Sequence, residues 1–212
     1  MDGVLIDSEP VHCKIEKIIF DQLGIVVPDD LHRNYLGASN EFMYQDLKSR
    51  FNLTVPVSDL LERDEILRVD FMGNSEIKLN EGVFTLLNEI KSATIKLAVA
   101  TSSSPAIAKI LLDKCGISSL FDAIVTTQEA GRSKPEPDVF LLAAQRVNVI
   151  PANCIVFEDS PNGILAAKGA GMYCVAIQTD GKYSKETIFA DYCISSFREI
   201  NLIQLLKIFT IN

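Results

Sequence analysis

The 212-residue chain lacks several features that would assign it to particular classes of protein. It has no excess of basic residues, because 20 Lys and Arg stand against 28 Asp and Glu and the formal net charge is −8. A nucleic-acid surface neutralises phosphates with clustered Lys and Arg, so this charge argues against one. No apolar run approaches the roughly 18 residues of a membrane-spanning helix. We therefore expect a protein that binds neither nucleic acid nor a membrane.

Paired cysteines are also missing. The five cysteines are scattered and form no Cys-x-x-Cys motif. Cys154, Cys174 and Cys193 lie inside apolar runs, where a reduced cysteine behaves as a small hydrophobic residue. The first residues carry no basic cluster of the kind found in signal peptides. We expect a reduced, cytoplasmic protein, and we expect it to be a monomer.

The first third of the chain has the periodicity of helices. From Val11 to Leu23 the apolar residues form one stripe, and Gly24 is suited to end that helix. Three further helices are predicted over residues 29–36, 40–51 and 57–72. No convincing strand is found in this region.

After Leu79 the pattern changes to alternating strands and helices. Continuous apolar strands that alternate with helices predict a parallel sheet covered on both faces, which is an α/β fold. The helical block is then an insertion between the opening segment and the α/β core. The predicted strands are 95–100, 123–125, 154–157, 173–177 and 192–194. Of the helices between them, the first follows the strand 95–100 and ends at residue 115, and two more span 138–147 and 161–170.

Polar side chains follow the apolar runs, at the edge of a parallel sheet where ligands bind. Asp2, Glu158 and Asp159 would supply the hard oxygen ligands that suit Mg²⁺. Thr101 offers a hydroxyl beside the backbone N–H groups of a helix start, and Lys134 offers a compact positive charge for an anion. Carboxylates, a metal, a hydroxyl and a lysine are what phosphoryl transfer requires.

Each of these motifs also has a purely structural interpretation. Ser104-Pro105 and Ser160-Pro161 are typical helix starts, in which the serine caps the first turn and proline takes the first helical position. Lys134-Pro135 is compatible with a solvated turn. The functional interpretation depends on the motifs occurring together.

Four stretches resemble, in order and spacing, the motifs of the haloacid dehalogenase (HAD) superfamily: DGVLIDSE, LAVATSSS, SKPEPDVF and VFEDSPNGILAAKGAGM. The resemblance covers essentially the whole chain and is to the branch with β-phosphoglucomutases and pseudouridine 5′-phosphatases. It implies a Rossmann-like three-layer core over residues 1–8 and 79–212. Residues 9–78 would be an inserted α-helical cap that closes over the substrate.

The same resemblance implies a role for each matching residue. Asp2 would be the general acid and base, with its backbone carbonyl also reaching the metal. Thr101 would hydrogen-bond the transferring phosphoryl group, and Lys134 would neutralise its charge. Glu158 and Asp159 would hold Mg²⁺ together with Asp2. Ser102, Ser103, His12 and Asn40 are the candidate substrate-binding residues.

Two departures from the family pattern bear on function. The family motif reads Asp-x-Asp-Gly, and its first Asp forms the aspartyl-phosphate. Here Met1 is at the x position, so the nucleophile and its strand are expected directly before Met1. Within Gly37-Ala38-Ser39-Asn40, Asn40 replaces an arginine that grips a second phosphate in mutases. His12 matches a histidine of some mutases, but it could equally be a surface residue of the first helix.

Losing a central strand would remove four or five buried apolar side chains, on the order of 6–15 kcal/mol, and leave two strands with unpaired inner edges. That energy is comparable to the whole stability of a domain. We therefore expect a truncated sequence, with a start codon misassigned to the Met of Asp-Met-Asp-Gly. The chain as printed would then be inactive.

The sequence thus predicts a Mg²⁺-dependent phosphatase of small phosphorylated metabolites, either sugar or nucleoside phosphates. The alternatives are a β-phosphoglucomutase-like phosphomutase and a non-catalytic metabolite-binding member of the fold. A 2-haloacid dehalogenase fits poorly, because that reaction has no use for a metal cluster of Asp2, Glu158 and Asp159.

Overall fold

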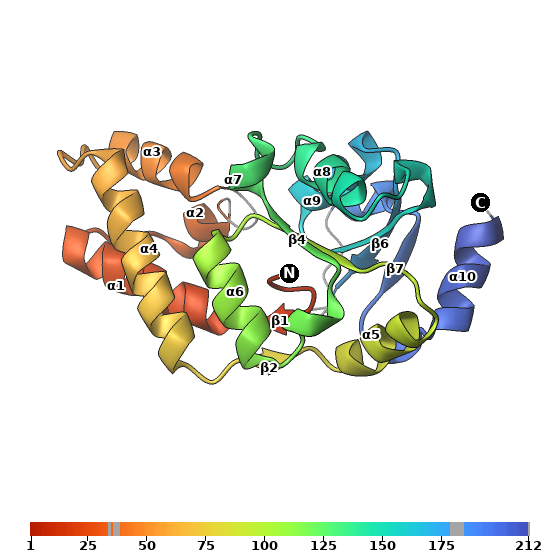
Figure 1. The fold of residues 1–212 in the computed structure, drawn as a ribbon. Helices are drawn as coiled ribbons and strands as arrows, with labels where there is room; N and C mark the ends of the chain where they lie inside the picture. The colour runs from red at the N-terminus through yellow and green to blue at the C-terminus, as the bar shows by residue number, and fades with distance from the viewer. Residues whose placement is uncertain (34, 36–38, 179–184, 212) are drawn as a thin grey trace. The chain divides into compact units, whose positions relative to one another are not determined.

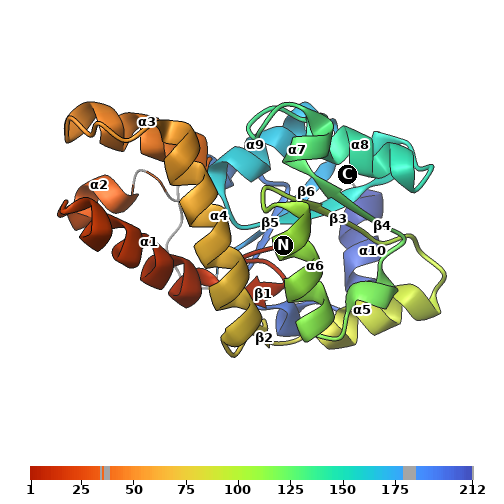
Figure 2. The same ribbon diagram turned by 60° about the vertical axis from the view of Figure 1, so that its left-hand side comes forward.

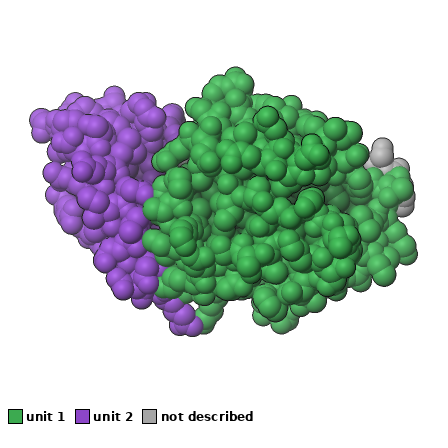
Figure 3. Space-filling model, viewed as in Figure 1, with its two compact units in different colours: residues 1–7, 77–212 green, residues 8–76 purple. Residues whose placement is uncertain are grey.

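The protein was analysed as a computed structural model that describes residues 1–33, 35, 39–178 and 185–211. It divides into two compact units, coloured separately in Figure 3. Unit 1 contains residues 1–7 and 77–212, and unit 2 contains residues 8–76. No helix in the described ranges is both long and apolar enough to cross a membrane.

Unit 1 is built on parallel strands, as predicted for an α/β fold. One pair consists of β3 and β4, and a second, three-stranded sheet has the order β5-β6-β7. A short antiparallel pair, β1 with β2, joins residues 6–7 to residues 78–79. The strand bounds are β1 Ile6–Asp7, β2 Lys78–Leu79, β3 Ala98–Thr101, β4 Ala123–Thr126, β5 Ile155–Glu158, β6 Tyr173–Ile177 and β7 Tyr192–Ile194.

Three predicted strands have different bounds in the structure, and one of them, 123–125, differs only by ending one residue later at Thr126. The strand predicted over residues 95–100 begins only at Ala98, because the N–H of Leu97 donates to the Asp122 carboxylate at 3.0 Å. The strand predicted over 154–157 runs from Ile155 to Glu158, so Glu158 is its last residue and does not follow it. Within the described part of the chain, β3 pairs with β4 alone and β5 pairs with β6 alone.

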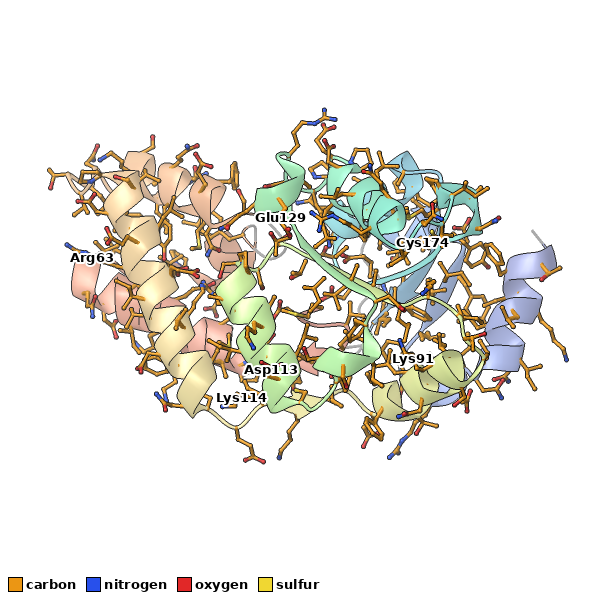
Figure 4. All side chains as sticks on the ribbon, in the orientation of Figure 1. Arg63, Lys91, Asp113, Lys114, Glu129 and Cys174 are labelled. Atoms are coloured by element: carbon orange, nitrogen blue, oxygen red, sulfur yellow. The ribbon has the colours of Figure 1, made fainter. Side chains whose placement is uncertain are left out.

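The helices of unit 1 lie on both sides of these strands. Figures 1 and 2 show α7, α8 and α9 on one side and α5 and α10 on the other. The core between α8, α9 and the sheet contains fully buried residues such as Val125, Val139, Ile164 and Cys174, the last of which is labelled in Figure 4. The helix bounds are α5 Val83–Ser92, α6 Pro105–Lys114, α7 Thr127–Ala130, α8 Asp138–Arg146, α9 Pro161–Gly169 and α10 Leu202–Ile211.

Side-chain caps fix where several of these helices begin. Ser104 accepts a hydrogen bond from the N–H of Ile107, and Ser160 accepts one from the N–H of Gly163. The predicted capping role of both serines is therefore confirmed. Thr126 and Glu129 form a reciprocal capping box at the start of α7. These caps fix the backbone at the carboxyl ends of β3, β4 and β5.

Helices are the regular secondary structure of unit 2 in its described residues, as the periodicity predicted. In α1 the predicted stripe is buried at Ile15 and Ile19, and Gly24 ends the helix with a left-handed φ of 67°. The helix predicted over 29–36 is observed to Arg33, and Asn34 and Leu36 lie outside the described residues. The bounds are α1 Glu9–Leu23, α2 Asp29–Arg33, α3 Asn40–Arg50 and α4 Val57–Asn74.

Candidate active site

Asp2 lies in a tight turn that leads into β1. The N–H of Gly3 donates to the carbonyl of Ile6 at 2.9 Å, and the N–H of Leu5 donates to that of Met1 at 2.8 Å. The Asp2 carboxylate accepts a 2.7 Å hydrogen bond from the hydroxyl of Ser103. The turn therefore brings Asp2 to the loop that follows β3.

Gly3 brings the same turn against the carboxylate of Asp159. Its φ is +66°, and a Cβ added there would lie 1.9 Å from Oδ2 of Asp159. Only glycine combines this backbone conformation with so close an approach. Asp2 and Asp159, which are 157 positions apart in the sequence, are thus held on neighbouring turns.

The loop after β3 has the form of an anion site. Thr101 is 2% exposed, and its hydroxyl accepts a 3.1 Å hydrogen bond from the N–H of Ser103. Ser102 is exposed, and α6 begins directly after Ser104. A buried hydroxyl that shapes a turn ahead of a helix N-terminus places backbone N–H groups where an anion can be bound.

Glu158 and Lys134 form a buried ion pair at the end of β5. Oε1 of Glu158 contacts the Lys134 ammonium, and the two side chains are 4% and 9% exposed. Oε2 accepts hydrogen bonds from the N–H groups of Asp159 and Ser160 and from the Ser160 hydroxyl, at 3.0 to 3.1 Å. The solvated-turn interpretation of Lys134 is therefore wrong, because the folded chain carries this lysine to the last residue of a buried strand.

The two adjacent carboxylates have opposite electrostatic environments. Burial alone would raise the pKa of Glu158, but the charges of Lys134 and the N-terminal ammonium, with the hydrogen bonds, lower it below its usual range. Burial and then the negative charge of Glu158 raise the pKa of Asp159 above its usual range. Asp159 is thus a buried carboxylate whose charged form would be stabilised by a nearby cation.

The residues at this edge fit a divalent metal ion in their chemistry. Asp2 and Asp159 offer hard oxygen donors on neighbouring turns, and the raised pKa of Asp159 is what a bound cation would reverse. In the described residues, however, no three His, Cys, Asp or Glu side chains gather as a ready metal cluster. Glu158, the third predicted ligand, is engaged by Lys134 and Ser160 in this arrangement.

The other two predicted substrate-binding residues, His12 and Asn40, belong to unit 2. They are joined there through a buried ion pair that the sequence analysis did not identify. Nε of Arg68 lies 2.6 Å from Oδ2 of Asp64, with side chains 6% and 2% exposed. Nδ2 of Asn40 donates to the same Oδ2 at 2.8 Å, and another nitrogen of the guanidinium contacts Nδ1 of His12.

The Asp64–Arg68 cluster is completed by Glu16 and Tyr44. Oε1 of Glu16 lies 3.3 Å from Nη2 of Arg68, and the Tyr44 hydroxyl donates to Oδ1 of Asp64 at 2.8 Å. Burial and the charge of Asp64 raise the pKa of Tyr44. Because a guanidinium is only a donor, Arg68 is the donor in any hydrogen bond of this contact and Nδ1 of His12 the acceptor.

Replacing Arg68 by alanine is expected to destabilise the protein by roughly 3–5 kcal/mol, because it leaves the buried carboxylate of Asp64 without the guanidinium that pairs with it. Urea denaturation followed by circular dichroism measures the change. Arg63→Ala is the matched control, since Arg63 is exposed on the same helix and is labelled in Figure 4. Equal urea midpoints for Arg68→Ala and Arg63→Ala would show that the buried Asp64–Arg68 pair contributes nothing to stability.

Comparison with known proteins places this chain in a family. Residues 1–177 match the family model described as haloacid dehalogenase-like hydrolase. The chain belongs to this family. The HAD-like α/β fold and the resemblance found in the sequence are thereby confirmed, and the family is one of hydrolases.

Relatives of this HAD-like protein include phosphatases and a mutase. A phosphorylated carbohydrates phosphatase of Thermotoga maritima is 33% identical over 81% of this chain and 79% of its own length. A β-phosphoglucomutase of Bacillus subtilis is 28% identical over 84% and 80%. The crystal structure of CbbY from Rhodobacter sphaeroides in complex with phosphate has a TM-score of 0.82, with 30% identity over 97% and 96% of the two chains.

Proposed function

We propose that the protein is a Mg²⁺-dependent phosphatase of small phosphorylated metabolites, either sugar or nucleoside phosphates. The observation that carries this proposal is the convergence of four segments beside the carboxyl ends of β3 and β5 in unit 1. Asp2 meets the loop after β3, Gly3 packs on Asp159, and Lys134 pairs with Glu158. The sugar-phosphate class is supported by the relative from Thermotoga maritima.

Each residue would make a defined contribution to phosphoryl transfer. Asp2, held by the Ser103 hydroxyl, would protonate the leaving oxygen and then take a proton from the attacking water. Thr101 and the N–H groups after β3, with Ser102 and Ser103, would bind the phosphoryl oxygens. Lys134, already in a buried site of low dielectric, would neutralise part of their charge.

Mg²⁺ is the cofactor that the donor set favours. Asp2, Glu158 and Asp159 would hold it, and when bound it would neutralise charge on the transferring phosphoryl group. Its binding would require Glu158 to share its carboxylate between Lys134 and the metal. We also propose that residues 9–78 act as a cap domain that excludes water during the reaction.

We propose that the nucleophile is an aspartate directly before Met1, the first Asp of the family motif Asp-x-Asp-Gly. The strand that carries it would lie between β3 and β5. Two observations support that place for it: in the described residues those strands have only β4 and β6 as partners, and Met1 is 8% exposed. The printed chain is then expected to be inactive by itself, because Asp2 lies two positions after that aspartate, too far along to attack phosphorus in line.

The hydrogen bond of the Asn40 side chain favours the phosphatase proposal over a mutase. A mutase must grip a second phosphate, and the amide nitrogen of Asn40 is engaged by Asp64. Arg68, the cation beside it, is held by Asp64, Glu16 and His12. These contacts leave the cluster as an internal network, which suits a substrate with one phosphate.

The test uses a chain extended by a short apolar segment ending in aspartate before Met1, called the extended chain below. It is expected to release inorganic phosphate from hexose, pentose or nucleoside monophosphates in the presence of Mg²⁺. With β-glucose 1-phosphate and catalytic β-glucose 1,6-bisphosphate it should not accumulate glucose 6-phosphate. Rapid formation of glucose 6-phosphate would establish the mutase, and phosphate binding without turnover of any ester would favour the non-catalytic alternative.

A further inference from the structure

Asn80, the residue after β2, holds the turn that carries Asp2. Its side-chain Nδ2 donates to the carbonyl of Gly3 at 3.0 Å and to that of Val4 at 2.7 Å. Its backbone N–H donates to the carbonyl of Leu5 at 2.9 Å. One residue thus satisfies three consecutive carbonyls of the turn, which is the full donor capacity of an asparagine amide nitrogen and one backbone N–H.

These contacts continue a very short strand pair. The antiparallel ladder of β1 and β2 contains only two residue pairs, Ile6 with Leu79 and Asp7 with Lys78. Beyond the end of the ladder, the side-chain amide of Asn80 donates the next hydrogen bonds along the turn toward Asp2. Without it, the carbonyls of Gly3 and Val4 would lose the donor that links them to the residue after β2.

The geometry of the turn determines how the acidic groups meet. Gly3, whose carbonyl Asn80 holds, is the residue that packs against Oδ2 of Asp159. Asp2, one position earlier, accepts from Ser103. A shift of the Gly3 carbonyl therefore changes the position of the Asp2 carboxylate relative to both the loop after β3 and Asp159.

Asn80 also borders a hollow of about 190 Å³, lined with it by Glu81, Ile177, Ser195, Ser196 and Phe197. The lining includes no residue of the turn, so the hollow adjoins Asn80 itself and gives no room directly to the backbone of residues 1–5. Packing also holds the turn, because Val4 and Ile6 are buried and Gly3 lies against Asp159. The hydrogen bonds of Asn80 add to this packing, because they fix the direction of the Gly3 and Val4 carbonyls.

We propose that Asn80 is a positioning residue for Asp2, and that it fixes the alignment of the general acid with the leaving oxygen. This inference rests on the proposed phosphatase function, in which Asp2 protonates the leaving group. The neutral amide suits the task, because it donates twice without adding charge beside the carboxylates. An aspartate of the same size would place acceptors against two carbonyls.

The experiment compares Asn80→Ala, Asn80→Asp and the control Asn88→Ala in the extended chain. Asn88 also donates its side-chain amide to a carbonyl, that of Phe84 at 2.7 Å, but it does so on the exposed surface of α5. The values of kcat/KM are measured for a sugar phosphate and for p-nitrophenyl phosphate. The sugar must be protonated as it leaves, because an alkoxide is a poor leaving group. p-Nitrophenolate is a stable anion and leaves without a proton.

Both Asn80 variants are expected to lose about 10²-fold in kcat/KM for the sugar phosphate, the cost of a misplacement of about 1 Å. The loss for p-nitrophenyl phosphate should be less than about tenfold, because misalignment of an acid matters little for a good leaving group. Asn88→Ala should change neither value. Equal losses for both substrates, or no loss for either, would overturn the proposal, because a merely structural role changes both alike.

A second measurement does not depend on turnover. Hydrogen exchange of the Gly3 and Leu5 amides should be at least about tenfold faster in Asn80→Asp than in Asn88→Ala, because the turn opens more often. Unchanged protection would overturn the positioning role. If the extended chain hydrolysed no phosphate ester, the proposed function would fail, and this exchange result would still decide whether Asn80 holds the turn.

Discussion

Asp159→Asn in the extended chain is expected to lower kcat/KM for a sugar phosphate by at least about 10³-fold. Asp159 offers a buried carboxylate whose charged form is disfavoured by burial and by Glu158. Such a group is suited to bind Mg²⁺, and an amide keeps its shape but loses the charge that a metal ion needs. Steady-state release of inorganic phosphate at saturating Mg²⁺ measures the effect.

The stability of the same variant separates lost chemistry from lost folding. The raised pKa means that ionised Asp159 costs stability above the usual carboxyl pKa, so the neutral amide should not lower Tm in EDTA. Mg²⁺ should raise Tm of the parent and leave that of Asp159→Asn unchanged. Asp113→Asn is the control, since Asp113 pairs with Lys109 on the surface of α6 and is labelled in Figure 4. If EDTA changed neither the Tm of the parent chain nor its rate of phosphate release, the metal assignment would be contradicted.

Local patterns were sufficient to predict the α/β fold and the elements that carry the site. Strands β4, β6 and β7 begin where apolar runs begin, and α6 and α9 begin at predicted Ser-Pro caps. Both features depend on neighbours in sequence, which a pattern records. The predicted start of β3 was wrong by three residues because the Asp122 carboxylate, 25 positions away from Leu97, takes up the N–H of Leu97.

The contacts that the sequence did not reveal connect distant segments. Asp64 and Arg68 are spaced as an ordinary surface pair of a helix, and only the fold shows that they are buried against Asn40 and His12. Asn80 reaches Gly3 and Val4 across 77 and 76 positions. For the Asp64–Arg68 pair, the available signal in the sequence was an acidic residue four positions before an arginine inside α4. No signal in the sequence indicated the contacts of Asn80 with Gly3 and Val4.

A second large effect is expected at the residue directly before Met1. In the proposed reaction this aspartate attacks phosphorus, whereas Asp2 transfers protons. Aspartate there should give Mg²⁺-dependent turnover, and asparagine should lower it by at least about 10⁴-fold, because an amide in place of the proposed nucleophile cannot form the aspartyl-phosphate. The two extended chains should have the same Tm, since the added strand stabilises the sheet in both.

The most direct test of the account is therefore phosphate release by these two extended chains, with the printed chain as the third sample. A sugar monophosphate is supplied with Mg²⁺ and then with EDTA, and inorganic phosphate is measured. The account predicts release only by the chain with aspartate before Met1, and only with Mg²⁺. Equal release by the asparagine chain, or release that continues unchanged in EDTA, would contradict a Mg²⁺-dependent phosphatase acting through an aspartyl-phosphate.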